Sequence, residues 1–313
     1  MIFDSPAILV IGYNAFDITV PMGDFPVPDS KVEVPFIRLG GGGPGATAAV
    51  SLARLGARVK LLTPLTDDSG GLTQRQELVT AGVDISDCPV FKGHECAKAV
   101  ILVQPETGNR TIFWSRGKLP TVDAGLWKDD WLQGVDLLYV DGHEPHLSII
   151  AARQARRMGV PVVFDAGSVR EGSEELVALC TDVISSSVFA LQLASCDDPL
   201  AALVDLQKRG PRRTAMTFGV EGVLALEESA FVVPAFKIDV ADTTGAGDVF
   251  HAGYAFALAR GGEFGDNLKF GAAVAALKCE HWGGRGGLPL LGDVLDLLEN
   301  GELHPVSPRL IPQ

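Results

Sequence analysis

The sequence predicts an α/β fold, in which a mostly parallel, doubly wound sheet lies between helices and carries a small β lid. Three observations predict it. Short, continuous apolar runs, typical of strands buried on both faces, recur along the chain. Helical stretches of about ten to fifteen residues separate many of these runs. Two segments, residues 13–38 and 95–114, interrupt the alternation with β-like patterns and turn residues.

The first apolar run is Ala7–Ile11, which is followed by Gly12. A helix is expected to begin near Gly45, because Ala46–Leu55 is rich in alanine and leucine and stops at Gly56. Val59–Leu62 is predicted to be the next buried strand. A strand, a helix and a second strand in this order predict a right-handed βαβ unit.

The alternation resumes in the second half of the chain. We expect, in order, strand Leu137–Val140, helix Ser148–Met158, strand Val162–Asp165, helix Glu174–Leu179, strand Val183–Ser185, strand Thr214–Phe218 and a hairpin-like return over Val223–Leu226.

The two irregular segments read as strands and turns that leave the main sheet. Residues 13–38 contain four prolines among short alternating pieces. Residues 95–114 contain two β-like runs, Ala97–Val103 and Arg110–Trp114, around the turn Pro105–Gly108. No low-complexity linker marks a second domain. We therefore predict one domain over residues 1–313, with these two segments forming the lid.

Composition restricts the ligand classes. The 26 Lys and Arg residues against 39 Asp and Glu residues give a net charge of −13. Nucleic acids and anionic membranes require a basic surface, so we expect neither as a partner. A small anionic ligand stays open, because a few backbone N–H groups can hold a phosphate group whatever the net charge.

The five cysteines are scattered and show no metal-binding spacing. Such a set is typical of reduced thiols. The first twelve residues lack the basic region of a secretory signal, and no stretch approaches the roughly 20 apolar residues that span a bilayer. We expect a cytoplasmic protein.

The most informative segment is Asp242–Asp248, which reads D-T-T-G-A-G-D and precedes a helical stretch. Small residues before a helix leave its first N–H groups free for an anion. A carboxylate would repel a bound phosphate, so its presence suggests a chemical role. Asp248 is predicted to accept the proton of a substrate hydroxyl that attacks phosphorus, while the N–H groups of about Ala246, Gly247 and Asp248 hold the developing charge. Glycine-rich helix starts are common, but the whole heptapeptide favours catalysis.

This heptapeptide resembles the C-terminal signature of the PfkB-type carbohydrate kinases, in the ribokinase-like superfamily. A second signature covers Gly42–Ala49, Leu55-Gly56 and Asp67-Asp68, and a third covers Thr217–Gly222. The C-terminal half looks most like the sulfofructose kinase branch. The resemblance spans the whole chain and implies a ribokinase-like fold, ATP as donor, Mg²⁺, and a sugar-like alcohol as acceptor. It also implies that Asp248 is the catalytic base and that Gly245–Gly247 form the anion hole.

For the nucleotide, the resemblance implies contacts from Ser187, Thr217, Gly219, Gly222 and Thr244. The sequence departs from the family at two places. Thr47 stands where many relatives have asparagine, and residues 187–190 read S-V-F-A where the family has N-x-x-E, an element tied to metal and phosphate. How Mg²⁺ is held is therefore open; it usually keeps several waters and binds substrate phosphates.

For the acceptor, Asp17 follows the first strand, and ligands of open α/β sheets bind beyond the carboxyl ends of strands. By resemblance, Asp17 binds two sugar hydroxyls with Asn14 nearby, Gly42 and Gly43 bring the backbone close to the sugar, and Thr47 lies beside them. A turn is the alternative role of these glycines.

Further candidates for acceptor contacts are Lys31, Arg110 and His143, which could equally be solvated surface residues. Trp114 could stack on a sugar or pack the lid. Asp242 and Thr244, with the loop His281–Gly287, match the region where some relatives bind a monovalent cation, which leaves K⁺ as an option.

Three other readings stay open. The acceptor could be a nucleoside, which an apolar, aromatic lid would favour, whereas Lys31 and Arg110 favour a sugar or sugar acid. The missing N-x-x-E pair suggests a catalytically silent sugar or nucleotide sensor, which Asp248 argues against. A dehydrogenase is more distant, because G-x-G-x-x-G at Gly40–Gly45 lies about thirty residues beyond the first strand. Relatives often form homodimers through their lids.

Overall fold

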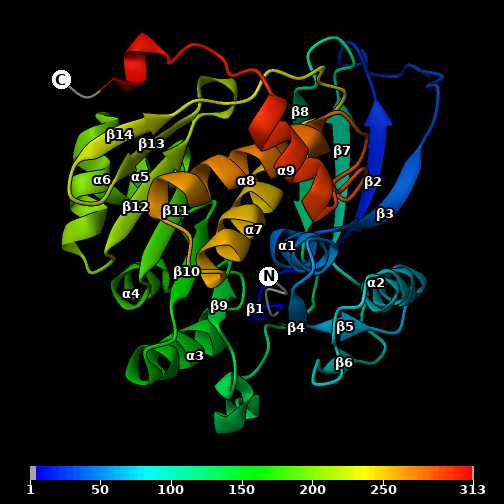
Figure 1. Cartoon of the computed structure of the whole chain (residues 1–313). Coiled ribbons are helices and arrows are strands. Elements are labelled where there is room, and N and C mark those ends of the chain that lie inside the picture. The colour runs from blue at the N-terminus through cyan, green and yellow to red at the C-terminus, as the bar shows by residue number, and fades with distance from the viewer. Residues whose placement is uncertain (1–4, 312–313) are drawn as a thin grey trace.

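In the computed structural model, which describes residues 5–311, eight strands form one large sheet (Figure 1). The strand order is β14-β13-β12-β11-β10-β9-β1-β4. The six strands β12, β11, β10, β9, β1 and β4 run parallel to one another. β13 and β14 return antiparallel at one edge. The strands are β1 (Ala7–Ile11), β4 (Arg58–Leu62), β9 (Leu137–Val140), β10 (Val162–Ala166), β11 (Asp182–Ser186), β12 (Arg213–Thr217), β13 (Val223–Leu226) and β14 (Ala230–Val233).

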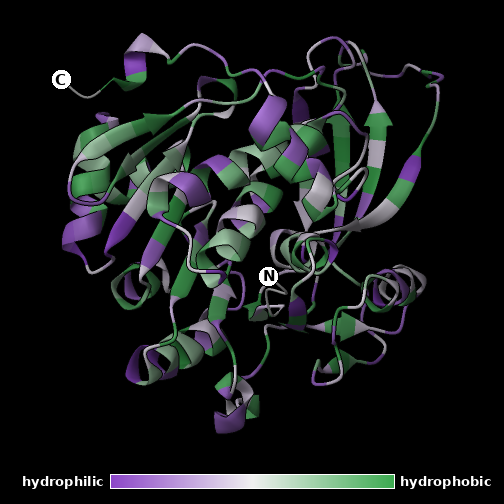
Figure 2. Cartoon of the chain, viewed as in Figure 1, coloured by the Kyte–Doolittle hydropathy of each residue, from purple (hydrophilic) through white to green (hydrophobic). Residues whose placement is uncertain are grey.

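Helices cover both faces of this sheet, which confirms the predicted doubly wound α/β fold. The helices of residues 5–311 are α1 (Pro44–Arg54), α2 (Ser69–Thr80), α3 (Pro145–Met158), α4 (Ser173–Leu179), α5 (Ser187–Ala194), α6 (Pro199–Lys208), α7 (Ala246–Ala259), α8 (Phe264–Cys279) and α9 (Leu291–Asn300). Among them, α2 packs mainly against β2, β3 and β5, and α9 packs on α8. Alternate strand residues serve the two faces: Ile8 and Val10 pack with α1, α7 and α8, whereas Leu9 and Ile11 pack with α3–α6. Figure 2 shows the resulting hydrophobic stretches along the large sheet.

A second, small sheet has the order β3-β2-β7-β8 and lies beside the large one (Figure 1). Its strands are β2 (Ala15–Pro21), β3 (Arg38–Gly42), β7 (Lys98–Val103) and β8 (Arg110–Ser115). Of the β-like pieces expected over residues 13–38, β2 and the first residue of β3 are strands, whereas residues 22–37 contain none. The strand β3 instead uses the glycine run. A short pair, β5 (Leu65–Thr66) and β6 (Val90–Phe91), completes the strands of the described chain.

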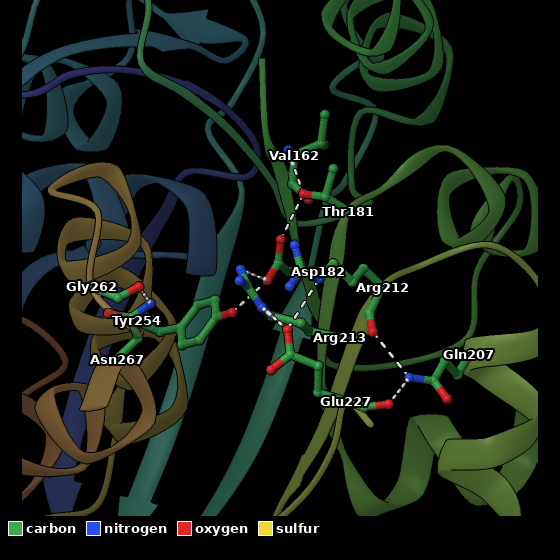
Figure 3. A network of polar contacts seen from close by, with 10 residues as sticks. All are labelled: Val162, Thr181, Asp182, Gln207, Arg212, Arg213, Glu227, Tyr254, Gly262 and Asn267. Carbon is green, nitrogen blue, oxygen red and sulfur yellow. Dashed lines mark hydrogen bonds and ion pairs between the residues drawn. The ribbon is translucent and has the colours of Figure 1, made fainter. Parts of the chain in front are cut away.

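A polar network fixes α7 to the large sheet (Figure 3). Tyr254 of α7 donates a hydrogen bond of 2.5 Å to Asp182 at the start of β11. Arg213 lies 3.4 Å from the same carboxylate and 2.9 Å from Glu227. Burying a charge requires such partners. The network therefore sets the position of the helix whose first turn contains Asp248.

Within residues 5–311, no single helix is long and apolar enough to cross a membrane; only the pair α5–α6, bent by 68°, meets those criteria together.

Candidate active site

A cavity of about 860 Å³ lies where the carboxyl ends of the parallel strands meet the small sheet. His143 follows β9, Ser186 ends β11 and Thr217 ends β12, and all three line it. The small sheet contributes residues that share one face by register: Asp17, Ala99, Ile101, Ile112 and Trp114. The first turn of α7 forms another wall. The cavity is thus built by segments that are distant in sequence.

The N-terminus of α7 presents free backbone donors to this cavity. Gly245 precedes the helix with φ 75°, and a Cβ atom there would lie 2.7 Å from the Gly284 carbonyl oxygen, so only glycine fits. Among the described residues, the N–H groups of Gly245, Gly247 and Asp248 have no acceptor. That of Ala246 already donates to Thr243 O at 3.1 Å, which corrects its predicted place in the anion hole.

The Asp248 side chain also lines the cavity, and it makes no hydrogen bond or ion pair with any residue between 5 and 311. Burial and the neighbouring Asp165 charge raise the pKa of Asp248 to about 7, against the opposing effects of His251 and Arg110. A free carboxylate with this pKa is suited to accept a proton near neutral pH.

Beneath Asp248 lies a buried group that the sequence analysis did not identify. His251 Nδ1 lies 2.9 Å from Asp165 Oδ1, and the Tyr139 hydroxyl donates to Asp165 Oδ2 at 2.7 Å. Burial alone would raise the pKa of Asp165, but the nearby His251 lowers it below the usual value. Asp165 is therefore ionised and supplies part of the charge that raises the pKa of Asp248.

Asp17 lies on β2 in the opposite wall and is also buried. Burial raises its pKa to about 7; Arg285 opposes this shift, and Glu77 and Asp242 add to it. A Cβ atom on Gly42 would overlap the Asp17 carboxylate. Gly43 has φ 83°, and a Cβ atom there would lie 2.7 Å from Tyr13 O. Close approach thus requires both glycines, Gly42 beside the Asp17 carboxylate and Gly43 beside the backbone of residues 13–15, although only Gly43 lines the cavity.

Arg285 is a second residue that the sequence analysis missed. Its guanidinium donates to Gly42 O at 2.8 Å, to Asn14 Oδ1 at 3.3 Å and to Thr47 Oγ1 at 3.4 Å, and it pairs with Glu77. Thr47 lines the cavity, whereas Asn14 is turned to Arg285 and Gln74 and does not. The glycines on both sides of Arg285 could have indicated this residue, since a run of glycines often marks a backbone that packs closely against neighbouring groups.

Of the residues predicted to contact the nucleotide, most line the cavity and one does not. Thr217, Gly219, Gly222 and Thr244 line the cavity, next to an apolar part formed by Val223, Phe236, Ile238, Ala272 and Ala276. Ser187 does not line it; its neighbour Ser186 does. Ala190 is fully buried in the core, so this segment offers no carboxylate where N-x-x-E would stand.

The remaining predicted residues are placed as follows. Arg110 and His143 line the cavity, and Arg110 donates to Thr243 Oγ1 at 3.0 Å. Lys31 is exposed on the segment between β2 and β3 and does not line the cavity. No group of three or more His, Cys, Asp or Glu side chains within residues 5–311 could hold a metal ion.

Asp242 does not fit a monovalent cation. Its two carboxylate oxygens accept the N–H groups of Thr244 at 2.8 Å and Gly283 at 2.7 Å. The fully buried Lys278 donates from Nζ to Asp242 O at 2.9 Å and to His281 O at 3.4 Å. The Lys278 amino group therefore already binds two backbone oxygen atoms of this loop, and both Asp242 carboxylate oxygens accept N–H groups. Thr244 Oγ1 is buried without a partner in the described chain.

Comparison with known proteins identifies kinases that are similar in sequence and in fold. Residues 6–290 match the pfkB family carbohydrate kinase. A nucleoside kinase of Methanothermobacter thermautotrophicus is 24% identical, covering 92% of this chain and 94% of its own length. An ATP-dependent ribose-1-phosphate kinase of Halopiger xanaduensis is 27% identical, with 89% and 93% covered. The solved ribokinase of Arabidopsis thaliana, complexed with ribose and ATP, shares the fold with a TM-score of 0.78 at 21% identity, covering 95% and 99%. The chain therefore belongs to the pfkB family of carbohydrate kinases and is an ATP-dependent phosphotransferase of the ribokinase-like kind.

Proposed function

We propose that this kinase transfers the terminal phosphoryl group of ATP to a hydroxyl of a sugar or sugar derivative. The observation that carries the proposal is the Asp248 carboxylate, which has no partner within residues 5–311, beside three N–H groups at the start of α7 that likewise have none there. Asp248 accepts the proton of the acceptor hydroxyl as that oxygen attacks phosphorus. The N–H groups of Gly245, Gly247 and Asp248 stabilise the charge on the transferred group.

Other residues bind and orient the two substrates. Asp17 accepts hydrogen bonds from acceptor hydroxyls, and the small sheet acts as a lid inserted in the single domain. The apolar part around Phe236 and Ile238 holds the base of ATP, with Thr217 and Gly219 near the phosphates. Mg²⁺ neutralises phosphate charge when bound. Because the described residues offer no metal-binding cluster, phosphate oxygens and water would supply most of its ligands.

Replacing Asp248 with asparagine tests this proposal. Removal of a general base typically lowers the rate by about 10²–10⁴. We expect Asp248→Asn to lose kcat to this extent on whichever acceptor a phosphotransfer screen identifies, while ATP binding, measured by calorimetry, is unchanged. The exposed Asp239→Asn is the matched control. Wild-type turnover in Asp248→Asn would refute the mechanism, and a wild-type chain that transfers phosphate to no sugar or nucleoside would favour a silent sensor.

A nucleoside acceptor is the second candidate. The cavity face of the small sheet carries Ala99, Ile101, Ile112 and Trp114, an apolar and aromatic surface on which a base could lie. A sulfonated ketose, which the C-terminal resemblance favours, belongs to the first candidate. Comparing adenosine, ribose, fructose and sulfofructose as acceptors separates them by kcat/KM.

The proposal includes a homodimer formed through the small sheet. Its outer face carries an apolar stripe in register across all four strands: Leu39, Ile18, Val100 and Phe113. Leu39 and Phe113 are 60% and 55% exposed. Exposed apolar stripes of this kind mark protein interfaces. Light scattering after size exclusion should give a dimer that Phe113→Glu converts to monomer and that the exposed control Phe25→Glu does not; a monomeric wild-type chain would contradict this part.

A further inference from the structure

One wall of the cavity holds polar side chains that the proposed transfer does not use. Tyr13 follows β1, Trp114 lies on β8, His143 follows β9 and Arg170 follows β10, and all four line the cavity. The Tyr13 and His143 rings stack with centroids 4.4 Å apart, and Trp114 meets each of them edge-on at 6.1 Å. Four separate segments thus bring aromatic and cationic groups to one place.

Arg170 is the unusual member of this wall. Its guanidinium lies over the Trp114 ring at 5.5 Å, and within residues 5–311 its side chain makes no hydrogen bond or ion pair. The neighbouring Arg116 differs, because it pairs with Glu144 at 2.5 Å and donates to three backbone carbonyls. Arginine stays charged in proteins, and a partly buried cation without a partner is costly. Arg170 therefore presents a full positive charge to the cavity.

The groups beside Arg170 are hydrogen-bond donors. The Tyr13 hydroxyl is buried and has no partner in the described chain. Burial raises the pKa of Tyr13 to about 12, so the hydroxyl keeps its proton. Burial, with the charges of Arg170 and Arg116, lowers the pKa of His143 to about 3, so its ring is neutral and retains one N–H. A cation and two neutral donors converge, which is the complement of an anion.

We propose that Arg170, Tyr13 and His143 form a subsite for an anionic substituent of the acceptor, a carboxylate, sulfonate or phosphate. The acceptor is then an acidic sugar derivative, and this inference rests on the proposed function. The donor phosphates are the other source of an anion. The proposal places them at the start of α7 beside Asp248, whereas the titratable groups that interact with Arg170 are Asp141, Tyr13 and Arg116. The acceptor substituent is therefore the better match.

The kinetic test compares matched acceptor pairs with ATP and Mg²⁺: ribose with ribose 1-phosphate, fructose with sulfofructose, and glucose with gluconate. We expect kcat/KM to be at least tenfold higher for the anionic member of the productive pair. Arg170→Met should lower that value by about ten- to a hundredfold, chiefly through the acceptor KM, and leave the KM of ATP unchanged. Arg170→Lys should restore part of it. The exposed Arg153→Met serves as the control.

A binding test does not depend on turnover. Without ATP, the anionic acceptor should raise the melting temperature of the wild-type chain and not that of Arg170→Met, and Tyr13→Phe should show a smaller shift than wild type. Equal kcat/KM for neutral and anionic members, or an Arg170→Met variant unchanged in both assays, would overturn the subsite and leave the kinase proposal intact. A wild-type chain that phosphorylates nothing but is stabilised by the acids would instead refute the kinase proposal alone. An ATP KM that rises in Arg170→Met would assign Arg170 to the nucleotide.

Discussion

Lys278 provides a direct test of how the loop before α7 is held. We expect Lys278→Ala to make the protein sensitive to K⁺, whereas the wild-type chain is indifferent to it. The variant removes the amino group that donates to Asp242 O at 2.9 Å and to His281 O at 3.4 Å. It also leaves space where a monovalent cation can reach these oxygens. The loop carries Asp242 and leads directly to Gly245.

The magnitude follows from the lost hydrogen bonds. The 2.9 Å bond is of normal length and the 3.4 Å bond is weak, so about one buried carbonyl loses its partner. Leaving such a group unsatisfied costs about 1–3 kcal/mol of unfolding free energy. For a domain of this size, we expect the melting temperature to fall by roughly 2–8 °C.

Differential scanning fluorimetry in matched chloride salts of K⁺, Na⁺ and tetramethylammonium measures the effect. K⁺ should restore part of the lost melting temperature in Lys278→Ala and change neither the wild-type chain nor the control Lys269→Ala on the same helix. Kinase activity should follow the same order. A wild-type chain that K⁺ stabilises or activates several-fold would show that Lys278 does not replace the cation. A Lys278→Ala variant with one melting temperature in all three salts would show that its oxygens are not a cation site.

Three further outcomes follow from the site and its supports. Because burial raises the pKa of Asp248 to about 7, log(kcat/KM) should fall with unit slope below pH 7. A raised pKa also means that ionising this carboxyl group destabilises the folded protein progressively as the pH rises from about 4 to above 7. Asp248→Asn should therefore have a higher melting temperature than wild type at pH 8 and not at pH 4. Gly245→Ala should lose at least tenfold in kcat and about 1–3 kcal/mol by denaturant unfolding, because of its positive φ and the contact with Gly284; full activity would show that the turn adapts. Tyr254→Phe should lose about 1–3 kcal/mol in the same unfolding assay with both KM values unchanged, and an unaltered unfolding midpoint would mean that Asp182 finds another donor.

The parts of the fold that could be predicted are those whose burial is visible in a short stretch of the sequence. β1, β9 and β13 have the predicted bounds, because each is a continuous apolar run. The helix α8 could not be recognised in the same way. Buried neighbours surround its Phe264–Cys279 segment, so it lacks the polar stripe that gives a surface helix its period. The strand β3 is hidden for a different reason: Arg38–Gly42 is mostly glycine, and pairing with β2 alone makes it a strand.

In the candidate site, too, the residues of a contiguous motif could be predicted and those that depend on distant partners could not. Asp248, Gly245 and Gly247 belong to one contiguous motif, whose chemistry can be inferred without a structure. Arg285, Asp165 and Arg170 each depend on partners more than 50 residues away in sequence: Asn14, His251 and Trp114. Nothing local in the sequence distinguishes Arg285, which has four acceptors, from the half-buried Arg170, whose side chain has none within residues 5–311. The fold decides which is structural and which is free to bind a ligand.

The contact between the β7–β8 hairpin and the loop before α7 suggests how acceptor binding and transfer are linked. At the tip of the β7–β8 hairpin, Gly108 O accepts both the N–H and the hydroxyl of Thr243, at 3.1 and 2.7 Å, and Arg110 donates to the same hydroxyl. Thr243 O in turn accepts the N–H of Ala246, the first residue of α7. The hairpin, whose strands line the cavity, is therefore hydrogen-bonded to the turn that carries Gly245 and Gly247, whose N–H groups have no acceptor within residues 5–311. Displacing the hairpin would cost Thr243 three hydrogen bonds and would remove contacts that hold the turn in this geometry. We therefore expect the anion hole to be best ordered while the hairpin is in place, an arrangement that would limit transfer of the phosphoryl group to water.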